Sequence, residues 1–134
     1  MSVFVDTSAL YALLNRNDAA HTPAAEEWTA LLSRRDTLVT SNYVLLEADA
    51  LLGRRLGLDA VRAVRATVEP VIGIIWVDSL VHEEAMDTLL GAGQRDLSLV
   101  DCVSFTVMRR WGIETAFAFA RHFVQQGFRC IPEQ

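Results

Sequence analysis

An aspartate ends the first apolar run of the chain. Residues 3–10 read VFVDTSAL, so Asp6 follows a strand-like segment and is itself followed by the hydroxyl residues Thr7 and Ser8. In a parallel sheet, ligands and reacting groups gather beyond the carboxyl ends of the strands, which is where we expect Asp6. Simple capping of the next helix explains Asp6 equally well. The two roles are compatible, because a helix amino terminus keeps a nearby carboxylate ionised and ready for a cation.

A second acid, Glu47, lies in the segment SNYVLLEADALLGRRLG at residues 41–57. Its neighbours three and four positions away are mainly apolar, so its charge costs free energy unless it finds a partner such as a cation. The structural alternative is an ion pair with Arg54, which lies seven residues ahead on nearly the same helical face. Asp49 points about 200° away from Glu47 around a helix. We therefore interpret Asp49 as a solvated surface residue.

A third acid, Asp101, lies in the segment RDLSLVDCVSF at residues 95–105. Ser98 and Asp101 have the spacing of a capping box, which predicts that a helix begins just after Ser98. Ser104 follows Asp101 by one turn on the same side of that helix. Capping and the helix dipole would explain Asp101 without any function. The set of three acids, more than any one of them, favours a functional interpretation.

The elements that must position these acids alternate along the chain. Such alternation of strands and helices predicts an α/β protein with a mostly parallel sheet covered on both faces. We expect helices to start at Thr22 and Ser79 and to break at Gly57, with a polar loop at 91–96. The strand-like runs are 3–5, 37–39, 73–77, 115–119 and 128–131, and the helical segments around Gly57 are 42–55 and 58–68.

Size and composition restrict the classes of protein. A chain of 134 residues predicts one domain, 1–134. No apolar run approaches the roughly 18 residues of a membrane span and no export signal is recognisable, so we expect a cytoplasmic protein without a membrane partner. Cys102 and Cys130 are expected to be buried free thiols. All 12 basic residues are arginine, so the chain lacks the lysine that P-loop NTPases, Schiff-base enzymes and related phosphotransfer domains normally require.

Together the segments VDTSAL, SNYVLLEADALL and LSLVDCVSF resemble the PIN-domain ribonucleases, in particular the VapC-type toxins of VapBC toxin-antitoxin pairs. The resemblance continues through AFAFARHFVQQGF at 116–128. It implies a three-layer α/β/α sandwich with four or five strands, which binds Mg²⁺ or Mn²⁺ and cleaves single-stranded or looped RNA. Asp6, Glu47 and Asp101 match the first three acids of the family. They are therefore the candidate catalytic residues and metal ligands, with Asp6 and Asp101 on the main ion and Glu47 as a further or water-mediated ligand.

The fourth acid of the family is missing, because Ala120 stands in its place within FAFARHF. Alanine can neither hold a metal ion nor orient water. Either the site works with three carboxylates and supporting groups, or the chain is a weakened or inactive PIN module that binds RNA or an antitoxin. The candidate supporting residues are Thr7, Ser8, Asp96 and Ser104.

Arginines and apolar residues indicate the partners. Arg109, Arg110 and Arg121 follow the third and fourth acid positions and are our candidates for contact with RNA phosphates. The alternative for each is a solvated position or an ion pair, which we favour for the arginines flanking Gly57: Arg54, Arg55, Arg62 and Arg65. Apolar residues there also predict a surface that one small sheet leaves partly uncovered, at Leu51, Leu52, Leu56 and Val61. Packing inside the monomer explains these residues equally well. The family resemblance implies a homodimer and an antitoxin whose tail covers such a surface. The histidines His21, His82 and His122 lack metal-ligand spacing and are expected to be structural or exposed.

Overall fold

The computed structural model describes residues 1–133. Its strands form one sheet in the order β3-β2-β1-β4-β5, and every neighbouring pair is parallel. The strands are β1 (Ser2–Val5), β2 (Thr37–Ser41), β3 (Gly73–Ile75), β4 (Thr115–Phe117) and β5 (Arg129–Ile131). The α/β class and the parallel sheet expected from the alternating pattern are therefore confirmed, with five strands.

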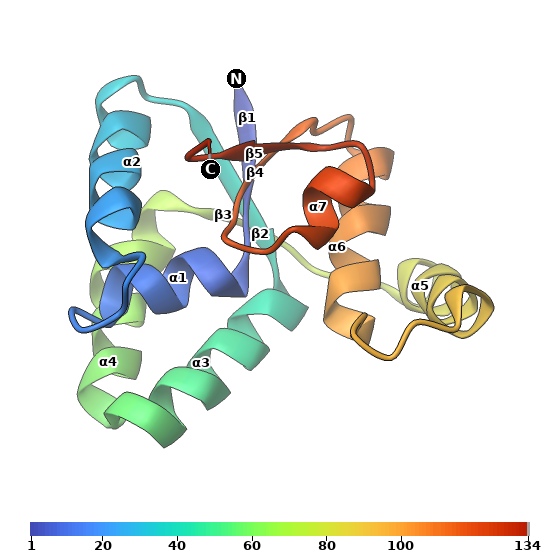
Figure 1. Cartoon of the computed structure of the whole chain (residues 1–134), viewed down its shortest axis with the longest axis horizontal. Coiled ribbons are helices and arrows are strands. Elements are labelled where there is room, and N and C mark those ends of the chain that lie inside the picture. Colours follow the sequence, from blue (N-terminus) through green and yellow to red (C-terminus); the bar gives the residue numbers. More distant parts are fainter. Residues whose placement is uncertain (134) are drawn as a thin grey trace.

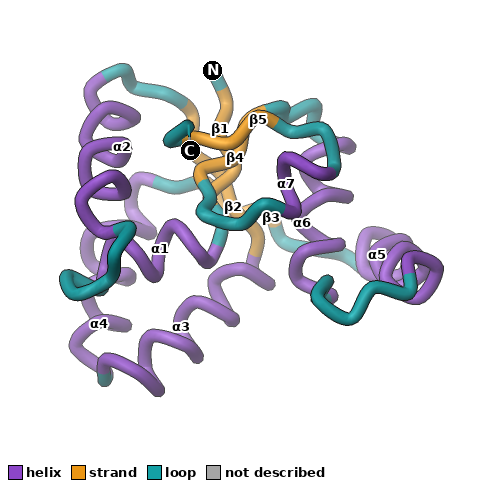
Figure 2. Tube along the Cα trace, viewed as in Figure 1, coloured by secondary structure: helices purple, strands orange, loops and turns teal. Residues whose placement is uncertain are grey.

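Helices cover the sheet on two sides. In Figure 1, α1, α2 and α4 lie on one side and α5, α6 and α7 on the other, while α3 runs below the carboxyl ends of the strands. Figure 2 shows the strands as the middle of these three layers. The helices are α1 (Thr7–Leu14), α2 (His21–Ser33), α3 (Asn42–Leu56), α4 (Leu58–Ala63), α5 (Ser79–Ala92), α6 (Leu99–Arg110) and α7 (His122–Gln125), with a π-helical turn η1 (Val64–Val68) and a 3₁₀ turn η2 (Glu69–Val71) leading into β3.

The core fixes the elements that carry the acids. Val3, Phe4 and Val5 of the central strand β1 are completely buried, because helices cover both faces of a parallel sheet. Helix α6 is buried along residues 102–108. Its Phe105 meets Phe123 of α7 edge to face, with ring centroids 5.2 Å apart. This packing holds the first turn of α6, and with it Asp101, at a fixed place beside the sheet.

Two expected helix starts differ in the residue that makes the cap. Thr22 was expected to begin a helix, but α2 already begins at His21, after Asp18 Oδ1 accepts a hydrogen bond of 2.8 Å from Ala20 N. The turn made by Asp18 thus starts the helix earlier than the Thr-Pro pair predicts. Helix α5 begins at Ser79 as expected, but Asp78 is its cap and accepts a hydrogen bond of 2.9 Å from Val81 N.

Strands β3 and β4 end two residues earlier than the apolar runs predict. Beyond β3, Val77 N donates to the side chain of Asn42 at 2.8 Å. Beyond β4, Phe119 N donates to Ser8 Oγ at 2.9 Å. Side chains therefore take backbone donors that a longer strand would have given to its neighbour.

The break at Gly57 is confirmed, because α3 ends at Leu56 and the φ of Gly57 is +90°, which favours glycine. The segment 58–68 is helical but changes to a π-helical turn at Val64. The polar loop expected at 91–96 is shorter, since α5 reaches Ala92. Cys102 is a buried free thiol as expected, and Cys130 is free but half-buried. Within residues 1–133, no helix has the length and apolarity needed to cross a membrane.

Candidate active site at the carboxyl edge of the sheet

Three helices start at the carboxyl edge of the sheet, and each carries one of the candidate acids. Asp6 follows β1 directly and caps α1, while Glu47 lies in the second turn of α3, just after β2. Asp101 lies in the first turn of α6. Because β1 is the central strand, with β2 on one side and β4 on the other, the first turns of α1, α3 and α6 lie at the same end of the sheet (Figure 1).

Asp6 is buried at this edge with only 4% of its surface exposed. Its Oδ2 accepts two hydrogen bonds from Ser8, one from the backbone N at 3.1 Å and one from Oγ at 2.6 Å. The pKa of Asp6 is raised to about 6: burial is the largest cause, the charges of Asp101 and Glu47 also raise it, and the two Ser8 bonds lower it. Both other acids therefore lie near enough to act on Asp6 electrostatically.

Asp101 takes part in the predicted capping box. Ser98 Oγ accepts a hydrogen bond from Asp101 N at 3.1 Å, and Asp101 Oδ2 accepts one from Ser98 N at 3.0 Å. Within residues 1–133 the second carboxylate oxygen, Oδ1, has no hydrogen-bond partner. The cap thus orients Asp101 and leaves one oxygen for a ligand.

Glu47 is half-buried, and no described residue makes a hydrogen bond or an ion pair with its carboxylate. The ion pair with Arg54 that would have explained Glu47 structurally is thus not formed in the described part of the chain. The interpretation of Asp49 as solvated is wrong. Its Oδ1 is buried without a hydrogen-bond partner in residues 1–133, and burial raises its pKa. The physical reason is that the face of α3 opposite Glu47 packs near Glu69 and Arg65, which both act on the Asp49 charge.

A chain of hydrogen bonds joins Asp6 to the position of the missing fourth acid. Phe119 N donates to Ser8 Oγ at 2.9 Å, and Ser8 Oγ donates to Asp6 Oδ2 at 2.6 Å. Ala120 follows directly and lines a cavity of about 490 Å³ together with Arg121 and Cys130. Burial raises the pKa of the Cys130 thiol, and the charge of Asp6 raises it further, so this cavity borders the acidic site.

Of the supporting residues expected from the sequence, only Ser8 contacts Asp6. Thr7 is buried, and its Oγ1 has no hydrogen-bond partner among the described residues. Ser104 is buried and donates to Val100 O at 2.9 Å, which is a bond within α6. Asp96 lies 3.7 Å from His122 Nε2.

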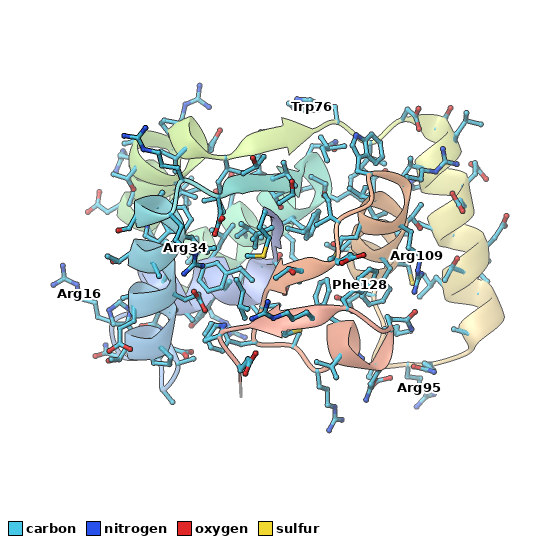
Figure 3. All side chains as sticks on the ribbon, turned by 90° about the horizontal axis from the view of Figure 1, so that it is seen from above. Arg16, Arg34, Trp76, Arg95, Arg109 and Phe128 are labelled. Atoms are coloured by element: carbon cyan, nitrogen blue, oxygen red, sulfur yellow. The ribbon has the colours of Figure 1, made fainter. Side chains whose placement is uncertain are left out.

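The arginines differ in how firmly they are engaged. The Arg109 guanidinium lies 5.2 Å from the centre of the Phe128 ring and donates to Gln126 Oε1 at 2.8 Å; Figure 3 shows it beside Phe128. Arg110 forms an ion pair with Glu84 at 2.9 Å. The Arg121 side chain is exposed and has no partner within residues 1–133. Of the three arginines predicted to contact RNA, Arg121 is therefore the most available, and its contact with RNA stays a prediction.

The acids fit a hard divalent cation by their chemistry. They offer only oxygen atoms, which Mg²⁺ and Mn²⁺ prefer. Asp6 is buried, and no arginine or histidine is among the groups that act on its pKa. A bound cation would therefore offset the cost of its buried charge. No three His, Cys, Asp or Glu side chains of residues 1–133, however, are gathered closely enough to hold a metal ion. Asp6, Glu47 and Asp101 are thus electrostatic neighbours but not a closed cluster.

Comparison with known proteins decides the family. Residues 3–128 match the PIN domain. This chain belongs to the PIN-domain family. It is 39% identical over 127 residues to the 23S rRNA-specific endonuclease VapC20 of Mycobacterium tuberculosis, a match that covers 94% of this chain and 95% of that protein. The resemblance read from the three acidic segments is therefore confirmed, and the chain is a homologue of the VapC-type toxins.

Solved structures agree with the PIN fold. The crystal structure of M. tuberculosis VapC20, described as a sarcin-ricin loop cleaving toxin, matches with a TM-score of 0.84 at 38% identity and covers 94% of this chain and 95% of that one. VapBC2 from Rickettsia felis, bound to a DNA fragment from its promoter, matches with a TM-score of 0.72 over 97% of both chains. At 12% identity, this second similarity shows the shared fold alone.

Sequence reasoning missed several residues near the acids. Tyr11 and Arg55 lie beside Ser8 in a cavity that Phe119 also lines. Tyr11 follows Ser8 by three residues and so shares its helical face, a signal that was present in the sequence. Phe119 and Cys130 come near Asp6 only through the pairing of β4 with β1 and β5. No local pattern indicates that pairing.

Proposed function

We propose that this protein is a metal-dependent endoribonuclease that cleaves RNA phosphodiester bonds, and that it is the toxin of a type II toxin-antitoxin pair. The observation that carries the proposal is the buried Asp6, whose pKa is raised by burial and by the charges of Asp101 and Glu47. A buried acid whose pKa is raised by burial and by acids from separate elements is typical of a functional site. The 39% identity to a 23S rRNA-specific endonuclease supports RNA as the substrate.

In this proposal Asp6 and Asp101 hold Mg²⁺ or Mn²⁺, with Glu47 as a further or water-mediated ligand. When bound, such an ion polarises a phosphoryl oxygen and lowers the pKa of a bound water. Ser8 orients Asp6 through its two hydrogen bonds, and Ser98 orients Asp101 through its backbone N. With a pKa of about 6, Asp6 is largely ionised at pH 7.5, as a metal ligand must be.

A second candidate function is a catalytically inactive PIN module that binds RNA or an antitoxin. Two observations favour it. Ala120 supplies no carboxylate where the family has its fourth acid, and residues 1–133 contain no closed group of three metal-ligating side chains. The cavity of about 490 Å³ beside Ala120 has room for the larger side chain of an aspartate.

Cleavage of a defined RNA separates the two functions. We would incubate the purified protein and its Ala120→Asp variant with a hairpin that carries the sarcin-ricin loop of 23S rRNA, with Mg²⁺ or Mn²⁺ and with EDTA as the metal-free control. Metal-dependent cleavage by the natural chain, lost at least about 100-fold in Asp6→Asn, is the expected result. Asp87→Asn, an exposed aspartate on α5, is the matched control and should cleave normally.

The other outcomes are equally informative. Cleavage only after Ala120→Asp would favour the inactive module. Full metal-dependent cleavage by Asp6→Asn would refute the assignment of Asp6 as a ligand. Cleavage in EDTA would refute the metal dependence itself.

The toxin role also implies partners and a location. A groove of about 490 Å³ between α1 and α4 is lined by Leu13, Leu14 and Leu56 together with the charged residues Arg16 and Asp59, and Leu56 is 39% exposed. Leu52, which we expected to be partly uncovered, is completely buried. We infer that a segment of an antitoxin covers this groove and that the toxin is a homodimer. We also infer that the toxin acts in the cytoplasm, where its RNA substrate is. Co-expression with the product of the adjoining gene and light scattering of the complex test these partners.

A further inference from the structure

A second cavity, of about 430 Å³, lies between α1, α3, the turn at residues 18–20 and the loop after β4. Its lining combines two aromatic residues, Tyr11 and Phe119, with Arg55 and Ser8. The rest of the lining is one acid, Asp18, together with Leu51 and three alanines. The groove between α1 and α4 also has an arginine, Arg16, and an acid, Asp59, but its other lining residues are leucine, alanine and asparagine, and none is aromatic. The two cavities therefore differ in chemistry, although both lie along α1.

The aromatic cavity is joined to the candidate active site through Ser8. The Ser8 hydroxyl lines the cavity and donates to Asp6 Oδ2 at 2.6 Å. Phe119, which also lines the cavity, donates its backbone N to the same hydroxyl at 2.9 Å. A polymer held at Asp6 would therefore place a neighbouring unit against this cavity.

The lining has the groups that recognise a nucleotide. The Arg55 guanidinium lies 5.5 Å from the centre of the Tyr11 ring, and the Tyr11 hydroxyl accepts a hydrogen bond of 3.1 Å from Asn15. Tyr11 and Phe119 are half-buried, so part of each ring is accessible. Arg55 is exposed and forms no ion pair within residues 1–133. Aromatic rings stack on bases of any sequence, and an unpaired guanidinium binds phosphate oxygens.

We propose that this cavity binds one unstacked base of the RNA next to the scissile phosphate, with Tyr11 and Phe119 contacting the base and Arg55 the adjacent phosphate. The inference rests on the proposed ribonuclease function and names a subsite for it. RNA fits the cavity better than a protein segment does, because the cavity offers two aromatic rings and a guanidinium that forms no ion pair within residues 1–133, and Ser8 joins it to Asp6. Looped RNA, whose bases are already unstacked, is the favoured substrate form.

Binding is measured separately from cleavage to test this subsite. The background is Asp6→Asn, which the proposed function expects to be unable to cleave. The probe is a fluorescein-labelled hairpin carrying the sarcin-ricin loop, together with hairpins in which each loop nucleotide in turn is replaced by an abasic ribose. Fluorescence anisotropy gives the dissociation constant of each pair. We expect one abasic position to weaken binding roughly tenfold, the scale of one base stacked on an aromatic ring.

The variants then assign that position to the cavity. Tyr11→Leu should weaken binding of the intact hairpin by a similar factor. In this variant the abasic ribose at that one position should not weaken binding any further, because both changes remove the same contact. Tyr11→Phe keeps the ring and should bind like the parent. Arg55→Gln should weaken binding of every hairpin and reduce its salt dependence. Arg54→Gln, the neighbouring exposed arginine that does not line the cavity, is the matched control and should bind like its parent.

The outcomes distinguish this inference from the proposed function. If the natural chain cleaves the hairpin but Tyr11→Leu and Arg55→Gln bind all hairpins like their parent, the subsite is refuted and the cavity is left to a protein partner. If the natural chain does not cleave but the abasic penalty still disappears in Tyr11→Leu, the base site stands and the ribonuclease function fails. Should Tyr11→Leu not fold by circular dichroism, Arg55→Gln at the surface decides the test.

Discussion

Burial of the Asp6 carboxyl group makes the stability of the metal-free protein depend on pH. Its pKa is raised from 3.8 to about 6, so the folded protein binds this proton more tightly than the unfolded chain does. The resulting stabilisation is complete below pH 3.8 and is lost as the pH rises through about 6. At neutral pH the ionised Asp6 therefore costs about 3 kcal/mol relative to its protonated form.

Asp6→Asn should stabilise the metal-free protein at pH 7.5 by about 1–3 kcal/mol. Asparagine has nearly the same shape and can still accept the Ser8 hydrogen bonds, but it carries no charge to bury. Urea unfolding at pH 4.5 and pH 7.5 measures the effect, and the gain should be smaller at pH 4.5, where Asp6 is protonated in the folded protein but still largely ionised in the unfolded chain. Asp87→Asn, at an exposed position, is the control and should not change the stability at either pH. A variant less stable than the natural protein at pH 7.5 would contradict the explanation.

Ser8→Ala should destabilise the protein by about 1–3 kcal/mol at pH 7.5, because it removes a hydrogen bond to an ionised group. The same change leaves Phe119 N without its acceptor, so part of the loss should persist at pH 4.5. The part that disappears at low pH reports the bond to the Asp6 carboxylate, which a merely structural serine would not show. Ser8→Thr keeps the hydroxyl and should restore the pH dependence. Equal losses of stability at both pH values would show that Ser8 does not position the Asp6 carboxylate.

At the scale of helices and strands, local patterns predicted the elements but not their side-chain partners. The serine and aspartate of the capping box predicted the start of α6, because both bonds form within one turn. The end of β4 was not predicted, since Ser8 is 111 positions away from the Phe119 donor that it binds. Asp49 was misread for a similar reason. Its surroundings come from η1 and η2, which fold back on α3, whereas its neighbours in the sequence suggested a solvated face.

The same distinction applies to the arginines that follow the acid positions. Arg109 and Arg110 lie in the last turn of α6, where cations are stabilised by the helix dipole. Their partners, Phe128 and Glu84, come from segments that only the fold brings near. Sequence position alone therefore favoured all three arginines for RNA contact. The packing of the elements gives Arg109 and Arg110 partners within the protein, whereas the Arg121 side chain has none within residues 1–133.

Ser98→Ala should separate the stability of α6 from the function of Asp101. Removal of an N-cap hydroxyl costs about 1 kcal/mol. Asp101 is held by Ser98 N, which alanine retains, so RNA cleavage should fall by less than about threefold. Asp78→Ala, which removes the cap of α5 far along the chain from the acids, should give a similar loss of stability and serves as the control. A loss of cleavage in Ser98→Ala as large as that in Asp101→Asn would show that the hydroxyl itself is needed.

Several large apolar side chains are exposed on the surface of the molecule. Trp76, which follows the edge strand β3, is 74% exposed, and Figure 3 shows it projecting from that side of the molecule. Leu46 of α3 and Leu80 of α5 are 73% and 67% exposed. A contiguous apolar patch is typical of a protein interface, so the homodimer proposed above predicts that these side chains become buried between two copies.

Divalent ions should stabilise the whole protein, and they should do so only by binding to the candidate acids Asp6, Glu47 and Asp101. A ligand that binds only the folded state stabilises it by mass action, about 2.7 kcal/mol at a concentration 100 times its Kd. We therefore expect millimolar Mn²⁺ or Mg²⁺ to raise the melting temperature by several degrees at pH 7.5, and EDTA to reverse the change. The rise should shrink at pH 5, because the proton on Asp6 then competes with the ion. Asp6→Asn should melt at the same temperature with and without metal, although it is the more stable protein without it. An equal rise in this variant would mean that the ion binds elsewhere, since nothing but the carboxylate charge has been removed.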